Sequence, residues 1–283
     1  MAHQISSVAV VGAGTMGQGI AQVCAASGHA TMLYDVNASL SAKAFDNIRL
    51  NLTQLVAKGK VNEQEKSSTL ERLSVATALT DLKVDLVIEA VVEKLEVKQK
   101  LFSELEAINQ SKAILATNTS SIPVTQIASA LKYQQKCVGL HFFNPATLMK
   151  LVEVISGVGT SEEVTQQMKT FATSLQKTAV IVKDSPGFIV NRVARHYYVE
   201  ALKLLEENVA THEQVDALLR SAGFKMGPFE LMDLIGMDVN FAVTSSLYHS
   251  FHQEPRFRPS RIQEQKVMAQ QLGRKTGKGF YEY

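Results

Sequence analysis

The chain has little cysteine, and no group of residues has the spacing of metal ligands. Its two cysteines, Cys24 and Cys137, belong to no CxxC pair and to no Cys/His cluster. We therefore expect buried thiols in a reducing, cytoplasmic compartment and no disulfide framework. We also expect no metal site, because no His, Cys, Asp and Glu residues cluster as such a site requires.

Strong net charge and long apolar runs are missing as well. The 29 basic and 27 acidic residues give a net charge of +2 with mixed signs. This balance indicates no nucleic-acid partner and no anionic membrane surface. No apolar run reaches the length of a membrane span. A strand that starts at Ile5 leaves no room for a signal peptide. The densest basic cluster, Arg274–Lys278, is either a solvated tail or a phosphate contact.

The sequence contains enough hydrophobic residues for the cores of two modest domains. The 283 residues are 46% hydrophobic, which supplies a sizeable core. Strand and helix patterns alternate up to the turn cluster Asp184–Gly187, and strand signals nearly vanish beyond it. We predict a Rossmann-type doubly wound α/β domain over residues 1–184 with a helical-hairpin insertion. An all-α domain over residues 185–283 follows.

A glycine pattern sits between the first predicted strand and the first predicted helix. The apolar run Ile5–Val11 leads into Gly12-Ala-Gly-Thr-Met-Gly17, and Asp35 ends the next strand. In a dinucleotide fold, Gly12 makes the tight turn, Gly14 lets a pyrophosphate approach, and Gly17 permits close helix packing. A helix N-terminus there would supply N–H donors. Asp35 would accept hydrogen bonds from the ribose and disfavour a 2′-phosphate, which predicts NAD over NADP; a purely structural glycine turn is the alternative.

Two helices should interrupt the alternation over residues 37–58 and 62–73. Asn37 is the expected cap of the first, and Asn62 with Glu65 forms the capping pattern of the second. Their polar residues Asn51 and Lys58 belong either to a solvated face or to a substrate-phosphate contact. Further helices are predicted at 93–109, 161–175, 188–208, 211–222, 226–236, 241–251 and 260–272, and strands at 30–34, 84–90, 113–116, 137–143, 151–155 and 179–182.

Several polar residues fall where a doubly wound sheet binds ligands, at the carboxyl ends of its strands. Glu93 and Ser120 occupy such places, although Ser120 could instead cap the helix that begins near Pro123. Asn191 follows the domain boundary and is either a junction residue or a helix-surface residue. Asp238 and Ser260 are expected helix caps.

The stretch Gly139–Glu153 brings together an imidazole and a carboxylate. It contains one predicted strand ending at Phe143, a turn at Asn144-Pro145, and a second apolar run interrupted by Glu153. A strand–loop–strand unit can place His141 beside Glu153. The carboxylate would then stabilise the imidazolium and fix its tautomer, so that the other ring nitrogen acts as a general base. A core histidine beside an unrelated acid is the alternative.

Several separated segments together resemble one family, the NAD-dependent L-3-hydroxyacyl-CoA dehydrogenases. The segments are Gly12–Gly17 with Asp35, Asn118–Ser121, His141–Pro145 with Met149–Val154, Pro186–Arg192, Met226–Leu231 and Leu272–Tyr281. The resemblance runs through essentially the whole chain in order. It implies oxidation of an L-3-hydroxyacyl-CoA to a 3-oxoacyl-CoA with NAD, by a homodimer.

The resemblance also implies residue roles. His141 becomes the catalytic base and Glu153 its partner acid, while Ser120 and Asn191 contact the substrate. Coenzyme A contacts fall on Asn51, where the family has Ser, and on Lys58. The implied cofactor contacts are Gly12, Gly14, Thr15, Met16, Gly17, Asp35, Glu93, Lys98, Ser120, Asn144 and Lys275. Like Asn51, the segment Ala146-Thr147-Leu148 departs from the family's sequence pattern, because many relatives carry a Pro at its centre.

Alternative functions remain open on the sequence. A β-hydroxyacid dehydrogenase acting on a free acid shares the two-domain plan, and a non-enzymatic NAD-binding structural or sensor protein could keep the fold. For the acyl chain, residues 192–198, 238–244 and 256–260 look most like the 3-hydroxyadipyl-CoA dehydrogenases of phenylacetate breakdown. The 3-hydroxybutyryl-CoA enzymes are close. A terminal carboxylate would need a cation, for which Arg192, Arg195 and Arg256 are the candidates.

Overall fold

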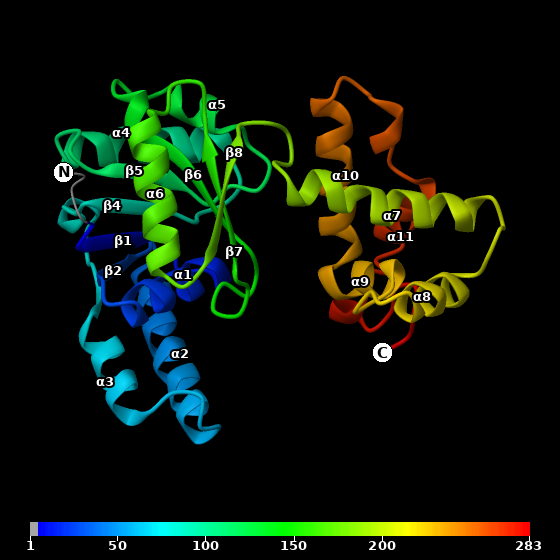
Figure 1. Ribbon diagram of the computed structural model, residues 1–283, viewed down its shortest axis with the longest axis horizontal. Helices are drawn as coiled ribbons and strands as arrows, with labels where there is room; N and C mark the ends of the chain where they lie inside the picture. The colour runs from blue at the N-terminus through cyan, green and yellow to red at the C-terminus, as the bar shows by residue number, and fades with distance from the viewer. Residues whose placement is uncertain (1–4) are drawn as a thin grey trace. The chain divides into compact units, whose positions relative to one another are not determined.

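A computed structural model of the protein describes residues 5–283. The chain divides into two compact units, Met1–Ser185 and Pro186–Tyr283. The first unit is a sheet with helices packed on it, and the second is helical (Figure 1). Within the described residues, no helix has the length and apolar character needed to cross a bilayer.

The sheet of the first unit has eight strands in the order β3-β2-β1-β4-β5-β6-β7-β8. All neighbours pair in parallel except β6 and β7, which are antiparallel. The chain leaves β1 to one side and returns to its other side at β4, which makes the doubly wound switch point of a Rossmann-type fold. The predicted fold class is therefore confirmed. The strands are β1 (Ser7–Val11), β2 (Ala30–Tyr34), β3 (Leu73–Val75), β4 (Leu86–Glu89), β5 (Ile114–Thr117), β6 (Cys137–Phe142), β7 (Leu151–Ser156) and β8 (Thr178–Lys183).

Three helices of the first unit begin where the sequence supplies a side-chain cap. The side chains of Asn37, Asn62 and Ser161 each accept a backbone N–H at a helix start, and Asn62 forms a capping box with Glu65. Helices α2 and α3 form the predicted hairpin (Figure 1). The elements are α1 (Thr15–Ala26), α2 (Ala38–Ala57), α3 (Glu63–Glu71), α4 (Leu95–Ile108), α5 (Val124–Ala128) and α6 (Glu162–Ser174), with short 3₁₀ turns η1 (Leu79–Asp81) and η2 (Gln134–Lys136).

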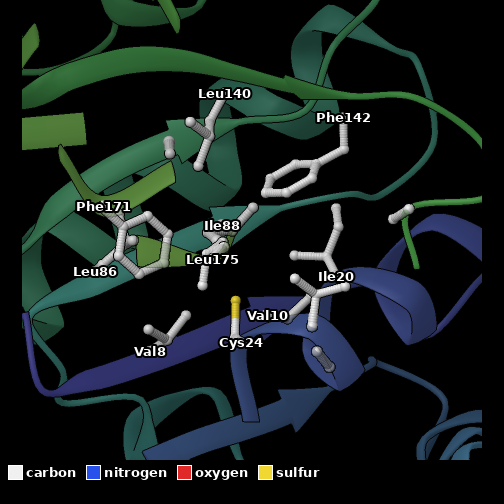
Figure 2. Packing of buried hydrophobic residues seen from close by; sticks show 14 of the residues in the cluster. Val8, Val10, Ile20, Cys24, Leu86, Ile88, Leu140, Phe142, Phe171 and Leu175 are labelled. Atoms are coloured by element: carbon white, nitrogen blue, oxygen red, sulfur yellow. The ribbon is translucent and has the colours of Figure 1, made fainter. Parts of the chain in front are cut away.

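An apolar core joins the sheet to helices α1, α2 and α6 (Figure 2). The strands are buried because both faces of a parallel sheet are covered, which explains their nearly continuous apolar runs. Cys24 of α1 lies inside this core, and burial raises the pKa of its thiol to about 12. Cys137 is buried with a similarly raised pKa, so both cysteines are the inert buried thiols that were expected. The labelled core residues are Val8, Val10, Ile20, Cys24, Leu86, Ile88, Leu140, Phe142, Phe171 and Leu175.

The second unit is assembled around a buried carboxylate. Asp216 accepts the backbone N–H groups of Phe229 (3.0 Å) and Glu230 (2.9 Å) and the hydroxyl of Tyr281 (2.8 Å). A Cβ on Gly227 would lie 2.2 Å from the Asp216 carboxyl carbon, so only glycine allows this approach. Its elements are α7 (Val190–Glu206), α8 (His212–Ser221), α9 (Pro228–Ile235), α10 (Met237–Ser250), η3 (Pro255–Phe257), α11 (Arg261–Met268) and η4 (Arg274–Thr276).

Two local predictions were wrong, and one of the two alternatives for Ser120 is excluded. The helix expected to reach residue 73 ends at Glu71, and the next residues form the edge strand β3. Ser120 does not cap α5, because the carboxylate of Asp184 accepts the N–H groups of Val124 (3.1 Å) and Thr125 (2.7 Å) there. Asp238 lies inside the first turn of α10, whose N-cap is Gly236.

Replacing Asp216 with Ala should lower the free energy of unfolding by about 2–4 kcal/mol, because two buried N–H groups and a phenol lose a charged acceptor. Chemical denaturation followed by circular dichroism measures the change. Asp46→Ala is the matched control, since Asp46 bonds to Arg49 on an exposed helix face. Equal denaturation midpoints for the two variants would contradict the role of Asp216.

Candidate active site

His141 and Glu153 face each other across the antiparallel pair β6–β7. The two residues are directly opposite in register, and His141 Nδ1 lies 2.8 Å from Glu153 Oε2. Their exposures of 6% and 1% leave little water to weaken the contact. The side chains meet because opposite residues of an antiparallel pair project to the same face. The predicted pair is therefore present in the structure.

The connection between these strands is held from two sides. Lys177 donates from its ammonium to the carbonyls of Ala146 (2.6 Å) and Met149 (2.8 Å). On the other side, a Cβ on Gly19 of α1 would lie 3.1 Å from the Ala146 side chain. The loop after His141 thus packs against the helix that follows the glycine turn. Asn144 is exposed at the start of this loop.

Asn118 ties the end of β5 to the strand that carries the histidine. Its side-chain oxygen accepts the backbone N–H of Phe142 at 2.8 Å. Phe142 is the neighbour of His141, and the ring of Phe143 lies 4.5 Å from the imidazole. The polar turn after β5 therefore restrains the backbone at the imidazole.

Glu93 organises the same turn. Its carboxylate accepts bonds from Thr119 Oγ1 (2.6 Å) and from the backbone N–H groups of Ser120 (3.0 Å) and Ser121 (3.1 Å). Burial by itself raises the pKa of Glu93, but Lys98 and the hydrogen bonds outweigh it and hold the pKa below its usual range. Glu93 therefore stays an anion and fixes the backbone at Ser120.

A buried ion pair supports the Glu93 carboxylate. Lys98 Nζ lies 2.6 Å from Glu89 Oε1 and 3.1 Å from Glu93 Oε2. Glu89 ends β4, is fully buried, and also accepts the hydroxyl of Thr117 at 2.7 Å. Three of the predicted ligand residues, Glu93, Lys98 and Ser120, thus form one network at the carboxyl ends of β4 and β5.

The glycine turn fits a dinucleotide. Gly12 has φ +106° and a Cβ there would meet Ala90 O at 2.5 Å, while a Cβ on Gly17 would lie 1.7 Å from Gly12 O. By contrast, nothing lies within 4 Å of a Cβ on the exposed Gly14. The loop is thus closed toward the protein and open outward at Gly14, where a pyrophosphate would approach the N–H groups at the start of α1.

Asp35 stands beside this loop. Its Oδ2 accepts the N–H of Ala13 at 2.8 Å and its Oδ1 the N–H of Asn37 at 3.0 Å. The half-buried carboxylate is therefore placed at the end of β2, next to the glycine turn. Thr15 and Met16 form the first turn of α1, which contains no acidic residue to repel an anion.

Of the other predicted ligand residues, two lie on helix α2 or at its C-cap and two belong to the second unit. Asn51 donates to Gln22 Oε1 at 2.9 Å, and Lys58 is the exposed C-cap of α2. Asn191 lies in the first turn of α7 and belongs to the second unit, as does Lys275, whose ammonium pairs with Asp238. Within residues 5–283, no three His, Cys, Asp or Glu residues are grouped so as to hold a metal ion.

Sequence reasoning missed three residues that build the site: Glu89, Asn118 and Lys177. Glu89 carried a usable signal, since it is a single acid in an apolar strand, as Glu153 is. Asn118 directly follows a strand in the polar turn. Lys177 gave no signal in the sequence, because its partners are backbone carbonyls about 30 positions earlier.

Comparison with known proteins covers both units. Residues 7–185 match the family model "3-hydroxyacyl-CoA dehydrogenase, NAD binding domain", and residues 187–283 match "3-hydroxyacyl-CoA dehydrogenase, C-terminal domain". A 3-hydroxyadipyl-CoA dehydrogenase of Escherichia coli is 49% identical over all of this chain, which spans 60% of that protein's length. A 3-hydroxybutyryl-CoA dehydrogenase of Clostridioides difficile is 41% identical over 98% of this chain and 99% of its own.

Comparison with solved structures gives the same family. The crystal structure of an Escherichia coli protein described as 3-hydroxybutyryl-CoA dehydrogenase superposes with a TM-score of 0.97 at 49% identity. The similarity covers 99% of this chain and 60% of that one. Family models match both units in order, and a relative of nearly the same length is identical to this chain at more than a third of its positions. This chain therefore belongs to the 3-hydroxyacyl-CoA dehydrogenase family.

Proposed function

We propose that this chain oxidises an L-3-hydroxyacyl-CoA to the 3-oxoacyl-CoA with NAD, and that His141 paired with Glu153 is its general base. The observation that carries the proposal is the 2.8 Å contact between His141 Nδ1 and Glu153 in a buried cross-strand pair. The acyl chain is short, as in 3-hydroxybutyryl-CoA or 3-hydroxyadipyl-CoA, the substrates named for the relatives.

In this proposal the proton of the C3 hydroxyl passes to His141 Nε2. When bound, NAD would supply the acceptor for the hydride that leaves C3. The alcohol thus loses a hydride from C3 and a proton from its hydroxyl, two electrons and two protons in all, and a ketone forms. Glu153 stabilises the positive charge that develops on the imidazole. Acid–base catalysis and correct positioning of C3 together lower the barrier.

The remaining residues bind and orient. Gly12, Gly14, Gly17 and the first turn of α1 would receive the pyrophosphate, and Asp35 the adenosine ribose. Ser120, whose backbone is held by Glu93, and Asn191 would hydrogen-bond the substrate oxygens. Lys98 supports Glu93 from its buried position, and contacts of Asn144 and Lys275 with the cofactor and of Asn51 and Lys58 with coenzyme A complete the assignment.

We also propose a homodimer in the cytoplasm. Apolar side chains exposed on the helical unit support self-association, among them Leu218 (71%) and Met268 (72%). The two buried thiols suit a reducing compartment. A monomeric mass in solution would contradict the dimer.

The purified chain should oxidise NADH in the presence of acetoacetyl-CoA, with NADPH on the order of 100-fold less efficient, because Asp35 repels a 2′-phosphate. Absorbance at the reduced nicotinamide band measures both rates. Asp35→Asn keeps an acceptor for the Ala13 N–H and should narrow the difference. Equal efficiency of the two cofactors, or turnover of free 3-hydroxy acids but not of CoA esters, would refute the assignment.

His141→Gln should lower kcat by roughly 10²–10⁴-fold, the contribution typical of a general base. Steady-state kinetics with an L-3-hydroxyacyl-CoA measures the loss, and NADH affinity should be unchanged. His249→Gln is the control, since His249 is exposed on α10. Turnover near that of the unmodified chain would remove His141 from the mechanism.

Glu153→Gln should lower kcat and move the acid limb of the pH–rate profile for alcohol oxidation to lower pH. The reason is that an imidazolium without its carboxylate is less stable, so the neutral base persists in more acidic solution. A kcat/KM profile against pH tests this. If the variant is slower but its acid limb stays in place, Glu153 serves the fold and not the base.

A further inference from the structure

Arg195 is a buried cation that has no carboxylate partner. It lies on α7 at 3% exposure, among the interior side chains of the helical unit. Its Nη1 donates to the carbonyl of Asn240 (3.0 Å), the side-chain oxygen of Asn240 (3.3 Å) and Thr244 Oγ1 (2.9 Å). The ring of Tyr198 lies 5.0 Å from the guanidinium carbon. Within residues 5–283, Arg195 forms no ion pair with any Asp or Glu.

Two donors in this group have no acceptor. Arg195 Nε and Asn240 Nδ2 are both buried, and neither has a hydrogen-bond partner in the described part of the chain. All the bonds of the guanidinium leave from Nη1, so its Nε–Nη2 edge donates to no described residue. That edge is the one that holds a carboxylate through two parallel bonds. A buried charge and two unsatisfied donors are costly, which is a reason to expect an anionic ligand.

The guanidinium stays charged in this position. Burial lowers the pKa of Arg195 to about 10, and the nearby Tyr198 opposes this only in part. The groups that accept its hydrogen bonds, Asn240 and Thr244, are neutral, and so is Gln263, which bonds to both of them. Nothing in the described cluster therefore neutralises the cation before a ligand arrives.

The position of Arg195 on α7 relates it to the proposed site. Asn191 and Arg195 are four residues apart on the same helix, so they share a face and lie ~6 Å apart along the axis. In a six-carbon acyl chain, the terminal carboxyl carbon is three bonds from C3, or ~4 Å when extended. The carboxylate oxygens reach about 1 Å further. A substrate whose oxygen is held by Asn191 would thus be long enough for a C6 carboxylate to span the one helical turn between Asn191 and Arg195.

We infer that Arg195 and Asn240 receive a terminal carboxylate of the acyl chain, so that the preferred substrate is the CoA ester of a six-carbon dicarboxylic acid, L-3-hydroxyadipyl-CoA. The inference rests on the proposed function, because it needs Asn191 at the substrate. The two other candidate arginines lie over aromatic rings and are not buried as Arg195 is. Arg192 stacks on Phe251 (4.7 Å), and the exposed Arg256 stacks on Phe257 (4.8 Å).

The test compares two six-carbon substrates, L-3-hydroxyadipyl-CoA and L-3-hydroxyhexanoyl-CoA, which differ only in a carboxylate against a methyl group. The unmodified chain should favour the dicarboxylyl ester in kcat/KM. Arg195→Met should reduce that preference on the order of 100-fold while the hexanoyl ester is turned over about as before. Arg256→Met is the matched control and should keep the preference.

A second variant keeps the test decisive if Arg195→Met does not fold. Asn240→Asp is nearly isosteric and gives Arg195 a carboxylate of the protein's own, so it should abolish the preference without removing the cation. Asn240→Asp with an unchanged preference would overturn the inference. The inference would also be overturned if Arg195→Met lowered kcat/KM for both esters equally. Loss of the preference for the dicarboxylyl ester in Arg256→Met would overturn it as well.

Failure of the function and failure of the inference give different results. An unmodified chain that oxidises neither ester refutes the proposed function. A chain that oxidises both without preferring the dicarboxylyl ester leaves the proposed reaction standing and refutes the role of Arg195. Measuring both esters in every variant therefore separates the two claims.

Discussion

The site depends on one reversal of strand direction. Only β6 and β7 are antiparallel in a sheet that is otherwise parallel, and this reversal puts His141 opposite Glu153. In a parallel sheet a connection of only eight residues could not bring them together, because parallel strands need a long crossover. A slip of one residue would turn the two side chains to opposite faces. The bonds of Asn118 to the end of β6 and of Lys177 to the connecting loop oppose such a slip.

In addition to this pair, acids at or after the ends of strands hold the backbone of the site in place. Glu89 ends β4 inside the protein, and Lys98 links it to Glu93, which in turn holds the backbone at Ser120. A buried ion pair contributes little net stability, because desolvation offsets the attraction. Its effect here is geometric, since each additional hydrogen bond restricts where the turn after β5 can lie. Preorganised polar groups of this kind support catalysis better than mobile ones.

Local chemistry explains what the sequence could predict. Asn37, Asn62 and Ser260 were recognisable as caps because the donor and the acceptor are within three residues of each other. The His141–Glu153 pair was predictable because a single turn joins its two apolar runs.

Apart from Asp238, which lies two residues past the N-cap of α10, the failures involve distant partners or very short elements. The N-terminus of α5 is capped by Asp184, about 60 positions later, so no local pattern could reveal that Ser120 is not the cap. β3 has three residues and is defined by pairing with β2 rather than by its own alternation. Lys177 acts through backbone carbonyls, which leave no trace in residue types. The placement of ligand residues in two separate units likewise lies beyond local patterns.

Among residues 5–283, three buried cations are stabilised in different ways, and the differences support the role given to Arg195. Lys98 is neutralised by two carboxylates, and Lys177 donates to two carbonyls that hold a loop. Arg195 has neutral partners on one nitrogen only, with a donor-bearing edge and an amide left without acceptors. A purely structural arginine would gain by pairing with a nearby acid, or by replacement with an apolar side chain of similar volume. An unneutralised guanidinium one turn from Asn191 is therefore better explained by an anion that comes and goes with the substrate than by the packing of the helices.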